Sequence, residues 1–216
     1  MPGSKSDFLE NKLLDHVVGN QAYTAPTNIH VALFTVAPTD SGGGTEVTGG
    51  SYARVQVTNN NTNFPNASSG LKQNGTAITF AQASADWGTI VAFGLFDAST
   101  SGNLLYWGWL GTDDGDLFTA TVADVLTAPG HSVVNDNVVR ILIVPGGTLP
   151  TGLTEGTTYF VISQSGDTFS LSTTQGGGAV NITASGSGLV AKITTKPVLN
   201  GDTPSFAINA LQIRED

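Results

Sequence analysis

The pattern of apolar runs and polar loops is clearest in two stretches of the chain, residues 28–54 and 86–110. Each stretch has an apolar run, a loop of Gly, Ser, Thr, Asn or Asp, and a second apolar run. β-branched and aromatic residues favour strands, whereas Gly, Asn and Asp favour turns, so each stretch predicts a β-hairpin. Neither stretch combines a nucleophile with a base or gathers metal ligands. The two hairpins therefore predict a β-sandwich that presents a surface rather than a reaction centre.

Shorter runs predict further strands of the same sandwich. Residues 29–36 are mostly apolar, as in a buried strand, and residues 51–58 alternate cleanly, which predicts one solvent-facing side. The Asn-rich run 59–70 predicts an exposed loop with little order of its own. The other strands are expected at residues 76–81, 90–97, 104–111 and 205–213. The last of these is expected to pair with the second hairpin.

One amphipathic helix is predicted at residues 6–18. Ser6 or Asp7 can cap its N-terminus, Asp7 and Glu10 have the spacing of a capping box, and Gly19 can end it. Its apolar face consists of Phe8, Leu9, Leu13, Val17 and Val18. Because a helix of this length is marginally stable alone, this face is expected to pack against its own domain or, alternatively, against another subunit.

A second group of predicted strands begins after Gly111, separated from the first by a short acidic segment. Residues 112–116 (TDDGD) predict a surface joint, and a second group of short strands separated by Gly and Pro turns follows. These strands are expected at residues 118–126, 138–144, 157–163, 167–172 and 188–193. The prediction is a discontinuous β-sandwich at residues 1–112 and 193–216 that carries a small β-module, residues 113–192, in one of its hairpins. The two ends of this module must then lie close together.

Composition narrows the class of protein. The chain has 216 residues with 27 Gly, and its 12% of charged residues is about half of the usual share of roughly 25%. Its net charge is −9 with only 8 Lys and Arg, so no stretch can follow a phosphate backbone. An acidic surface also repels anionic membranes, and no run approaches the ~18 apolar residues of a membrane span. Neither nucleic acid nor a membrane is an expected partner.

Candidate chemistry is sparse. The chain has no cysteine, which excludes disulfides and thiol catalysis. His16, His30 and His131 have no carboxylate or second histidine at metal-ligand spacing. The acidic residues at 112–116 lack the spacing of a calcium loop, so a solvated joint is the better interpretation. We therefore expect no enzyme activity, no cofactor and no metal site.

Two tryptophans are candidates for a contact surface. Trp107 and Trp109 are two residues apart, so they share one face of a strand. Packing in the core or between subunits is the ordinary interpretation of such a pair, and stacking on carbohydrate is the alternative.

A family of small structural proteins of tailed bacteriophages, described as tail-fibre-like or head-decoration proteins, resembles this chain in three blocks: SDFLENKLLDHVV, AYTAPTNIHVALFTVAPTDSGGGTEVTGGSYAR and WGTIVAFGLFDASTSGNLLYWGWL. Members end in a strand after an N/S-G-D-T turn, which here is residues 200–203. The resemblance covers about residues 6–111 and 194–213. These motifs are specific for the family, but they do not distinguish the head of the virion from its tail.

Residues 113–192 are absent from the short members of this family. The runs LTAPGHSVVNDNVVRILIV and LPTGLTEGTTYFVISQSGDTFSLSTTQGGGAVNIT resemble a small β-module that recurs in phage fibre and virion surface proteins. The resemblance implies that this module is inserted into the host domain.

The resemblance also implies a non-enzymatic virion protein. The first expectation is a capsid decoration, or cement, protein: a homotrimer that binds the major capsid protein on the outer capsid surface. The alternative is a component of a tail fibre, tail tip or baseplate whose inserted module contacts host-surface carbohydrate. A third interpretation is a stand-alone carbohydrate-binding module. The expected contacts with the capsid or with other subunits are made by Phe8, Leu9, Leu13, Val17, Trp107 and Trp109.

Overall fold

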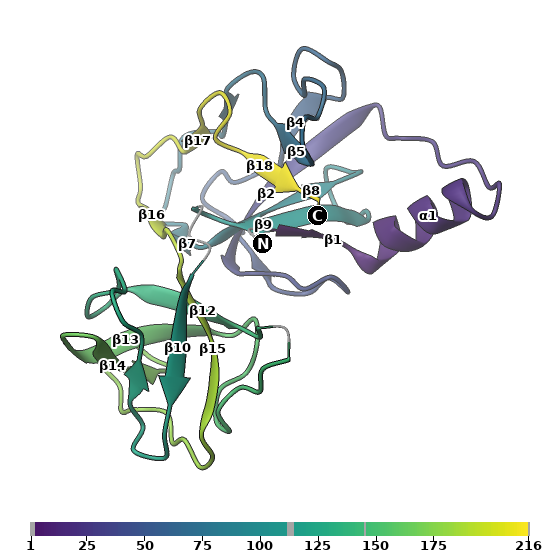
Figure 1. Ribbon diagram of the computed structural model, residues 1–216. Coiled ribbons are helices and arrows are strands. Elements are labelled where there is room, and N and C mark those ends of the chain that lie inside the picture. Colours follow the sequence, from purple (N-terminus) through teal and green to yellow (C-terminus); the bar gives the residue numbers. More distant parts are fainter. Residues whose placement is uncertain (1–2, 112–114, 145, 216) are drawn as a thin grey trace. The chain divides into compact units, whose positions relative to one another are not determined.

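The structure is a computed structural model that describes residues 3–111, 115–144 and 146–215. The chain divides into two compact units, one formed by Met1–Leu110 with Thr195–Asp216 and the other by Gly111–Thr194. Each unit has its own hydrophobic core. Among the described residues there is one helix and the regular structure is otherwise β (Figure 1), which confirms the predicted all-β class.

The larger unit is built on an antiparallel sheet with the strand order β1-β9-β8-β2-β3, in which β4 also pairs with β2. Its strands are β1 (Gly3–Lys5), β2 (Asn28–Val36), β3 (Thr45–Glu46), β4 (Val55–Thr58), β8 (Ala92–Phe96) and β9 (Leu104–Trp109). Both predicted hairpins are present, as β2–β3 and β8–β9. β2 and β8 read as nearly continuous apolar runs because residues on both of their faces are buried.

Three short ribbons pair the C-terminal part of the chain with residues 71–90. They consist of β5 (Leu71–Gln73) with β18 (Gln212–Arg214), β6 (Ile78–Thr79) with β17 (Ser205–Phe206), and β7 (Gly88–Ile90) with β16 (Lys196–Val198). Side chains of the ribbons and of the main sheet share one buried cluster, including Val31, Leu33 and Phe93 from the sheet and Ile78 and Leu211 from the ribbon side. The core of the larger unit therefore lies between the sheet and the ribbons.

The predicted strand at residues 205–213 is wrong in two respects. It is interrupted by a turn in which Asn209 has a φ of 64°, so that it forms β17 and β18. These strands pair with β6 and β5 and not with the second hairpin. The outer neighbour of β9 is instead β1.

Two other predictions for this unit need correction. The strand predicted at residues 51–58 is shorter, because Ser51 has a φ of 63° and lies in a turn, so that β4 begins only at Val55. The loop 59–70 is more ordered than predicted. The Asn60 side chain accepts hydrogen bonds from the backbone N–H groups of Thr62 and Asn63, and Phe64 is buried in the core.

Helix α1 (Asp7–Val17) confirms the predicted helix with Ser6 as its N-cap. The Ser6 hydroxyl accepts a hydrogen bond from the Leu9 N–H and donates one to the Leu104 carbonyl, which fastens the helix to β9. At the other end Asn20, and not Gly19, adopts the left-handed conformation, with a φ of 54°.

The smaller unit is a closed antiparallel barrel with the strand order β10-β11-β14-β13-β12-β15. Its strands are β10 (Asp116–Ala120), β11 (Leu126–Thr127), β12 (Val138–Leu142), β13 (Thr158–Ser165), β14 (Thr168–Ser172) and β15 (Gly186–Lys192). Phe118, Phe169 and Val161 are among the side chains that fill its interior. The predicted strand 118–126 is broken by a turn at Asp124, whose φ is 59° and whose carboxylate accepts a hydrogen bond from the Ile182 N–H at 2.6 Å.

The two ends of the smaller unit lie side by side. A Cβ atom on Gly111, which has a φ of +97°, would stand 2.5 Å from the Thr194 hydroxyl. In the larger unit the flanking residues also converge, because the Leu110 N–H donates to the Val91 carbonyl and Lys196 pairs with Ile90. The strands on either side of the smaller unit are β9 and β16, and β16 pairs with β7. The connection that carries the smaller unit is therefore not the hairpin that the sequence predicted.

Candidate functional site

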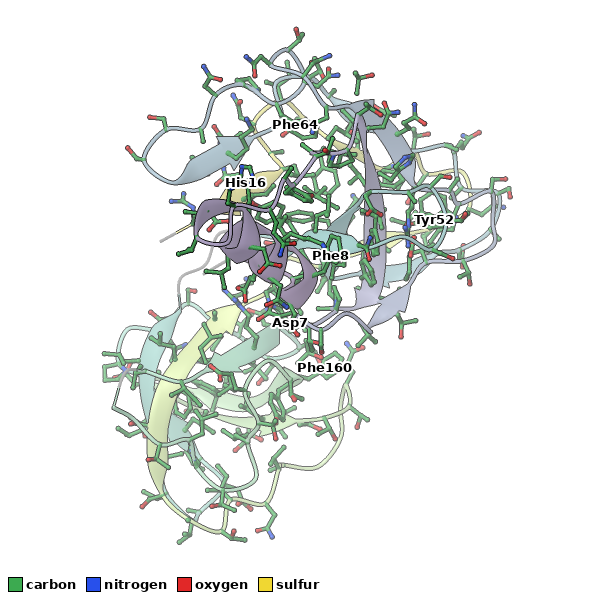
Figure 2. All side chains as sticks on the ribbon, turned by 90° about the vertical axis from the view of Figure 1, so that its right-hand side faces the viewer. Asp7, Phe8, His16, Tyr52, Phe64 and Phe160 are labelled. Carbon is green, nitrogen blue, oxygen red and sulfur yellow. The ribbon has the colours of Figure 1, made fainter. Side chains whose placement is uncertain are left out.

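The predicted contact residues lie in different places on the larger unit. Leu9 is buried, Leu13 and Phe8 are half-buried, and Val17 is 78% exposed at the far end of α1. Figure 2 shows Asp7 and Phe8 at the start of this helix and His16 near its end. These four helix residues therefore differ widely in exposure, and their contacts with the capsid or other subunits stay a prediction.

The tryptophan pair lies on the face of the main sheet that is turned away from the core cluster. Trp107 and Trp109 pair with Gly94 and Ala92 of β8, and strand alternation places them opposite the core-facing Leu95. Their rings contact each other at 5.9 Å in a T-shaped arrangement. The indole N–H of Trp107 donates to Asp40 at 2.9 Å, and Trp109 is 6% exposed. Within the chain the two rings therefore pack against each other and Asp40 on this face, and a contact of the pair with another subunit stays a prediction.

A polar cleft opens beside these residues, with a volume of about 520 Å³. Phe34, Phe96 and Leu104 form its apolar floor, and its rim includes Asp7, Phe8, Asp40, Gly42, Gly43, Gly44, Arg54 and Asn103. Gly42, Gly43 and Gly44 belong to the loop that joins β2 to β3. A Cβ atom on Gly44 would lie 2.6 Å from the Val36 carbonyl oxygen, so only glycine fits at this position. The cleft is thus bordered by the β2–β3 turn and the start of α1.

Arg54 lines this cleft, and partners within the chain engage its guanidinium group. Its guanidinium binds Glu46 in a bidentate pair at 2.9 and 2.7 Å and donates to the carbonyl groups of Ala98 and Ser101. It also stacks on Phe96, 3.5 Å from the ring centroid. Because every charged edge of Arg54 is already engaged, its arrangement indicates bracing of the two hairpin loops rather than an anion site.

A second, apolar groove of about 490 Å³ runs along α1. Its lining comes from α1, the connection to β2, the loop 59–70 and the C-terminal segment with β18, together with residues of β2, β5, β8 and β9. The apolar side chains that line it are Leu9, Leu13, Tyr23, Ala25, Pro26, Ile29, Phe64, Ala67, Leu95, Leu105, Tyr106 and Ile213. We call it the helix groove.

Among the residues that line the helix groove, few have polar or charged side chains, namely Asn59, Lys72 and Glu215. Glu215 forms an ion pair with Lys5 and accepts a hydrogen bond from the Tyr106 hydroxyl, and burial, followed by the charge of Glu215, raises the pKa of this tyrosine. Lys72 lines the rim from β5. An apolar floor with a few charged groups at the edge is suited to apolar side chains of a partner.

Next to the helix groove, α1 exposes three large apolar side chains. Leu14, Val17 and Val18 are 62%, 78% and 81% exposed. Their spacing of three and four residues places them on one stripe of the helix. We call this group the exposed stripe. The predicted apolar face is therefore split, since Leu9 and Leu13 pack against the unit whereas Val17 and Val18 do not.

The three histidines lie apart in the sequence and in different parts of the fold. His16 lies on α1 beside the Gln21 carbonyl. His131 packs edge-on against Phe169 in the barrel, and neither of its ring nitrogens is hydrogen-bonded. His30 is buried in β2, where burial and then Arg54 lower its pKa. In residues 3–111, 115–144 and 146–215 no three potential metal ligands come together. Asp113 and Asp114 lie outside the described residues.

Several residues of the site carry no local sequence signal. Leu14 is an apolar residue of the predicted helix, but it lies outside the predicted apolar face. Phe64 and Lys72 lie in segments with polar composition, and they reach the helix groove only through the fold of the loop 59–70 and the pairing of β5 with β18. The spacing of Leu14, Val17 and Val18 was the one signal that could have indicated the exposed stripe.

These features define a β-rich protein built around contact surfaces, with open clefts and an uncovered helix face. The family described as podophage GP4 fiber I protein gp80 matches residues 4–128, which is more than half of the 216 residues. The chain therefore belongs to this family of bacteriophage fibre proteins, and it is a structural protein of a phage virion. No curated protein matches the chain. None of the described helices is long and apolar enough to cross a membrane.

Proposed function

We propose that the protein is a non-enzymatic component of a phage tail fibre or a neighbouring tail structure. The observation that carries this proposal is the family match over residues 4–128. A fibre family favours the tail alternative over the capsid decoration protein that was the first expectation. Nothing in the family's description refers to the capsid, so the major capsid protein is not the partner that we propose.

In this proposal the two units have different binding partners. The larger unit attaches the protein to the virion, and the smaller unit is an inserted module that contacts carbohydrate on the host surface. Two observations support such a module: the barrel has its own core, and its ends Gly111 and Thr194 lie side by side. An insertion with adjacent ends costs little loop entropy and leaves the host core intact.

We also propose that the protein assembles as a homotrimer. Its binding would then be multivalent, so that three weak carbohydrate contacts give a firm attachment. The low share of charged residues and the exposed apolar side chains of α1 support self-association.

The location can be tested by quantitative mass spectrometry and immunogold labelling of purified virions. A tail fibre component should be present at a few to a few tens of copies, with label confined to the tail. Hundreds of copies with label over the head would overturn the proposal in favour of capsid decoration. Binding of the purified full chain to an array of host glycans tests the carbohydrate contact separately.

A further inference from the structure

We propose that the helix groove of one copy receives the exposed stripe of a second copy. The inference rests on the proposed trimer and adds the surface that forms it. It assigns both halves of the contact to the same chain, one concave and one protruding.

The concave half is the helix groove. Its floor is formed by side chains such as Leu13, Phe64 and Ile213, and its volume of about 490 Å³ lies in the range of sites that bury apolar groups. Its walls come from well-separated parts of the chain that are joined by strand pairing, for example Lys72 with Ile213. The groove is therefore formed before any partner binds.

The protruding half is the exposed stripe. Val17 and Val18 lie three and four residues after Leu14, and each of the three is more than half exposed. The described part of the chain covers none of them, although the neighbouring Leu9 and Leu13 are covered. Apolar anchors of this kind, inserted into a preformed pocket, dominate the affinity of protein interfaces.

Charge selects a second copy as the occupant. Asp15 lies one residue after Leu14 and three before Val18, beside the exposed stripe, and Lys72 lines the groove. Among the described residues, neither side chain has an ion pair within its own chain. The chain carries 17 Asp and Glu but only 8 Lys and Arg, so a lysine at the groove rim is one of few cations available to an acidic partner. Asp15 of one copy and Lys72 of the next supply the complementary pair.

A contact between two different surfaces of the same chain is heterologous. Such contacts close into a ring when the rotation between copies is a simple fraction of a turn. A three-fold ring uses every stripe and every groove once, so that no apolar half remains uncovered. An isologous pairing of two stripes would instead leave both grooves empty.

The test measures self-association of the full-length protein by sedimentation equilibrium and native mass spectrometry. Replacement of Leu14, Val17 and Val18 by Gln should weaken the association constant by at least about 100-fold. The control replaces Leu199 and Ile208, which are 57% and 59% exposed elsewhere on the larger unit, by Gln and should leave association unchanged. Circular dichroism and thermal unfolding confirm that each variant is folded.

A charge-swap cycle tests whether stripe and groove meet each other. Asp15→Lys and Lys72→Glu should each weaken association by about tenfold, and the double variant D15K/K72E should return to within about threefold of the wild type. The proposal is overturned if the wild type is monomeric at about 100 µM or if the stripe variants associate as the wild type does. It is also overturned if the double variant associates no more tightly than the single variants. Self-association is measured on the isolated protein and its place on the virion by labelling, so the two proposals can fail separately.

Discussion

At the scale of single residues, the larger unit depends on polar side chains that are held inside it. The Tyr52 hydroxyl accepts a hydrogen bond from the Leu33 N–H and donates one to Glu46. Its ring also contacts Trp87 edge-on at 5.2 Å. Burial raises the pKa of Tyr52, and the same cause raises the pKa of Tyr106. Both phenols are therefore kept protonated by the fold.

These two tyrosines predict a loss of stability at alkaline pH. The unfolded chain releases the phenol protons near the ordinary pKa of 10.0, whereas the folded protein retains them. The stabilising contribution is therefore complete below about pH 10 and falls as the pH rises further, by up to about 1.4 kcal/mol per pH unit for each phenol. Urea unfolding of the wild type between pH 9 and 11 measures this slope.

The variant Y52F/Y106F is the comparison for this measurement. It should have a shallower slope above pH 10, because neither side chain can ionise. It should also be less stable at neutral pH, by about 1 to 3 kcal/mol, because the Leu33 N–H loses its acceptor. A slope equal to that of the wild type would contradict the role assigned to the two phenols.

At the scale of elements, the sequence pattern predicted hairpins better than it predicted isolated strands. β2, β8 and β9 are strongly apolar and appear where expected. β8 and β9 are joined by a short loop and pair with each other, and β2 pairs with β8 inside the sheet. The predicted strands 118–126 and 205–213 are broken, because Asp124 and Asn209 adopt left-handed conformations that long-range hydrogen bonds stabilise. A local pattern does not reveal such distant partners.

Asn74 joins two turns of the ribbon layer. Its side chain is completely buried, donates to the carbonyl groups of Thr76 and Ala207 at 2.8 Å, and accepts from the Leu211 N–H at 2.9 Å. Asn-Gly is a common turn dipeptide, so the sequence at Asn74-Gly75 indicates a turn and no more. The structure shows that this asparagine also fixes the turn between β17 and β18.

Substitution of this residue should be costly. N74A leaves two carbonyl groups and one N–H without partners in a buried position and should lower the free energy of unfolding by about 3 kcal/mol. N74D should cost at least as much near neutral pH, because a carboxylate cannot donate to the two carbonyls. The exposed Asn66, replaced by Ala, is the control and should change stability by less than about 0.5 kcal/mol. Equal stabilities of N74A and N66A in chemical denaturation would refute this role.

At the scale of the whole molecule, the chain forms two compact units with separate cores. In the larger unit, Leu110 and Lys196 bind the adjacent residues Val91 and Ile90. A short bridge can therefore replace the whole smaller unit without disturbing the strands on either side.

Removal of residues 111–194 tests this independence. A variant in which a short Gly-Ser linker joins residues 110 and 195 should retain cooperative unfolding and the β-rich circular dichroism of the larger unit. The separate fragment 111–194 should also fold, because its six strands close a barrel without edges. Two-dimensional NMR spectra of each piece should overlay on subsets of the full-length spectrum. A spectrum with the narrow chemical-shift dispersion of an unfolded chain, for either piece, would show that the units depend on each other for folding.

The sequence by itself determined the all-β class, the helix with its Ser6 cap, the two hairpins and the resemblance to phage structural proteins. These features follow from local periodicity and from turn and cap residues, which act over a few positions. The tertiary structure alone decided that the face of the sheet with Trp107 and Trp109 is turned away from the core cluster, and that the helix groove forms. It also decided that Leu14, Val17 and Val18 remain uncovered. Burial and strand partners depend on contacts between distant segments, and no local pattern carries that information.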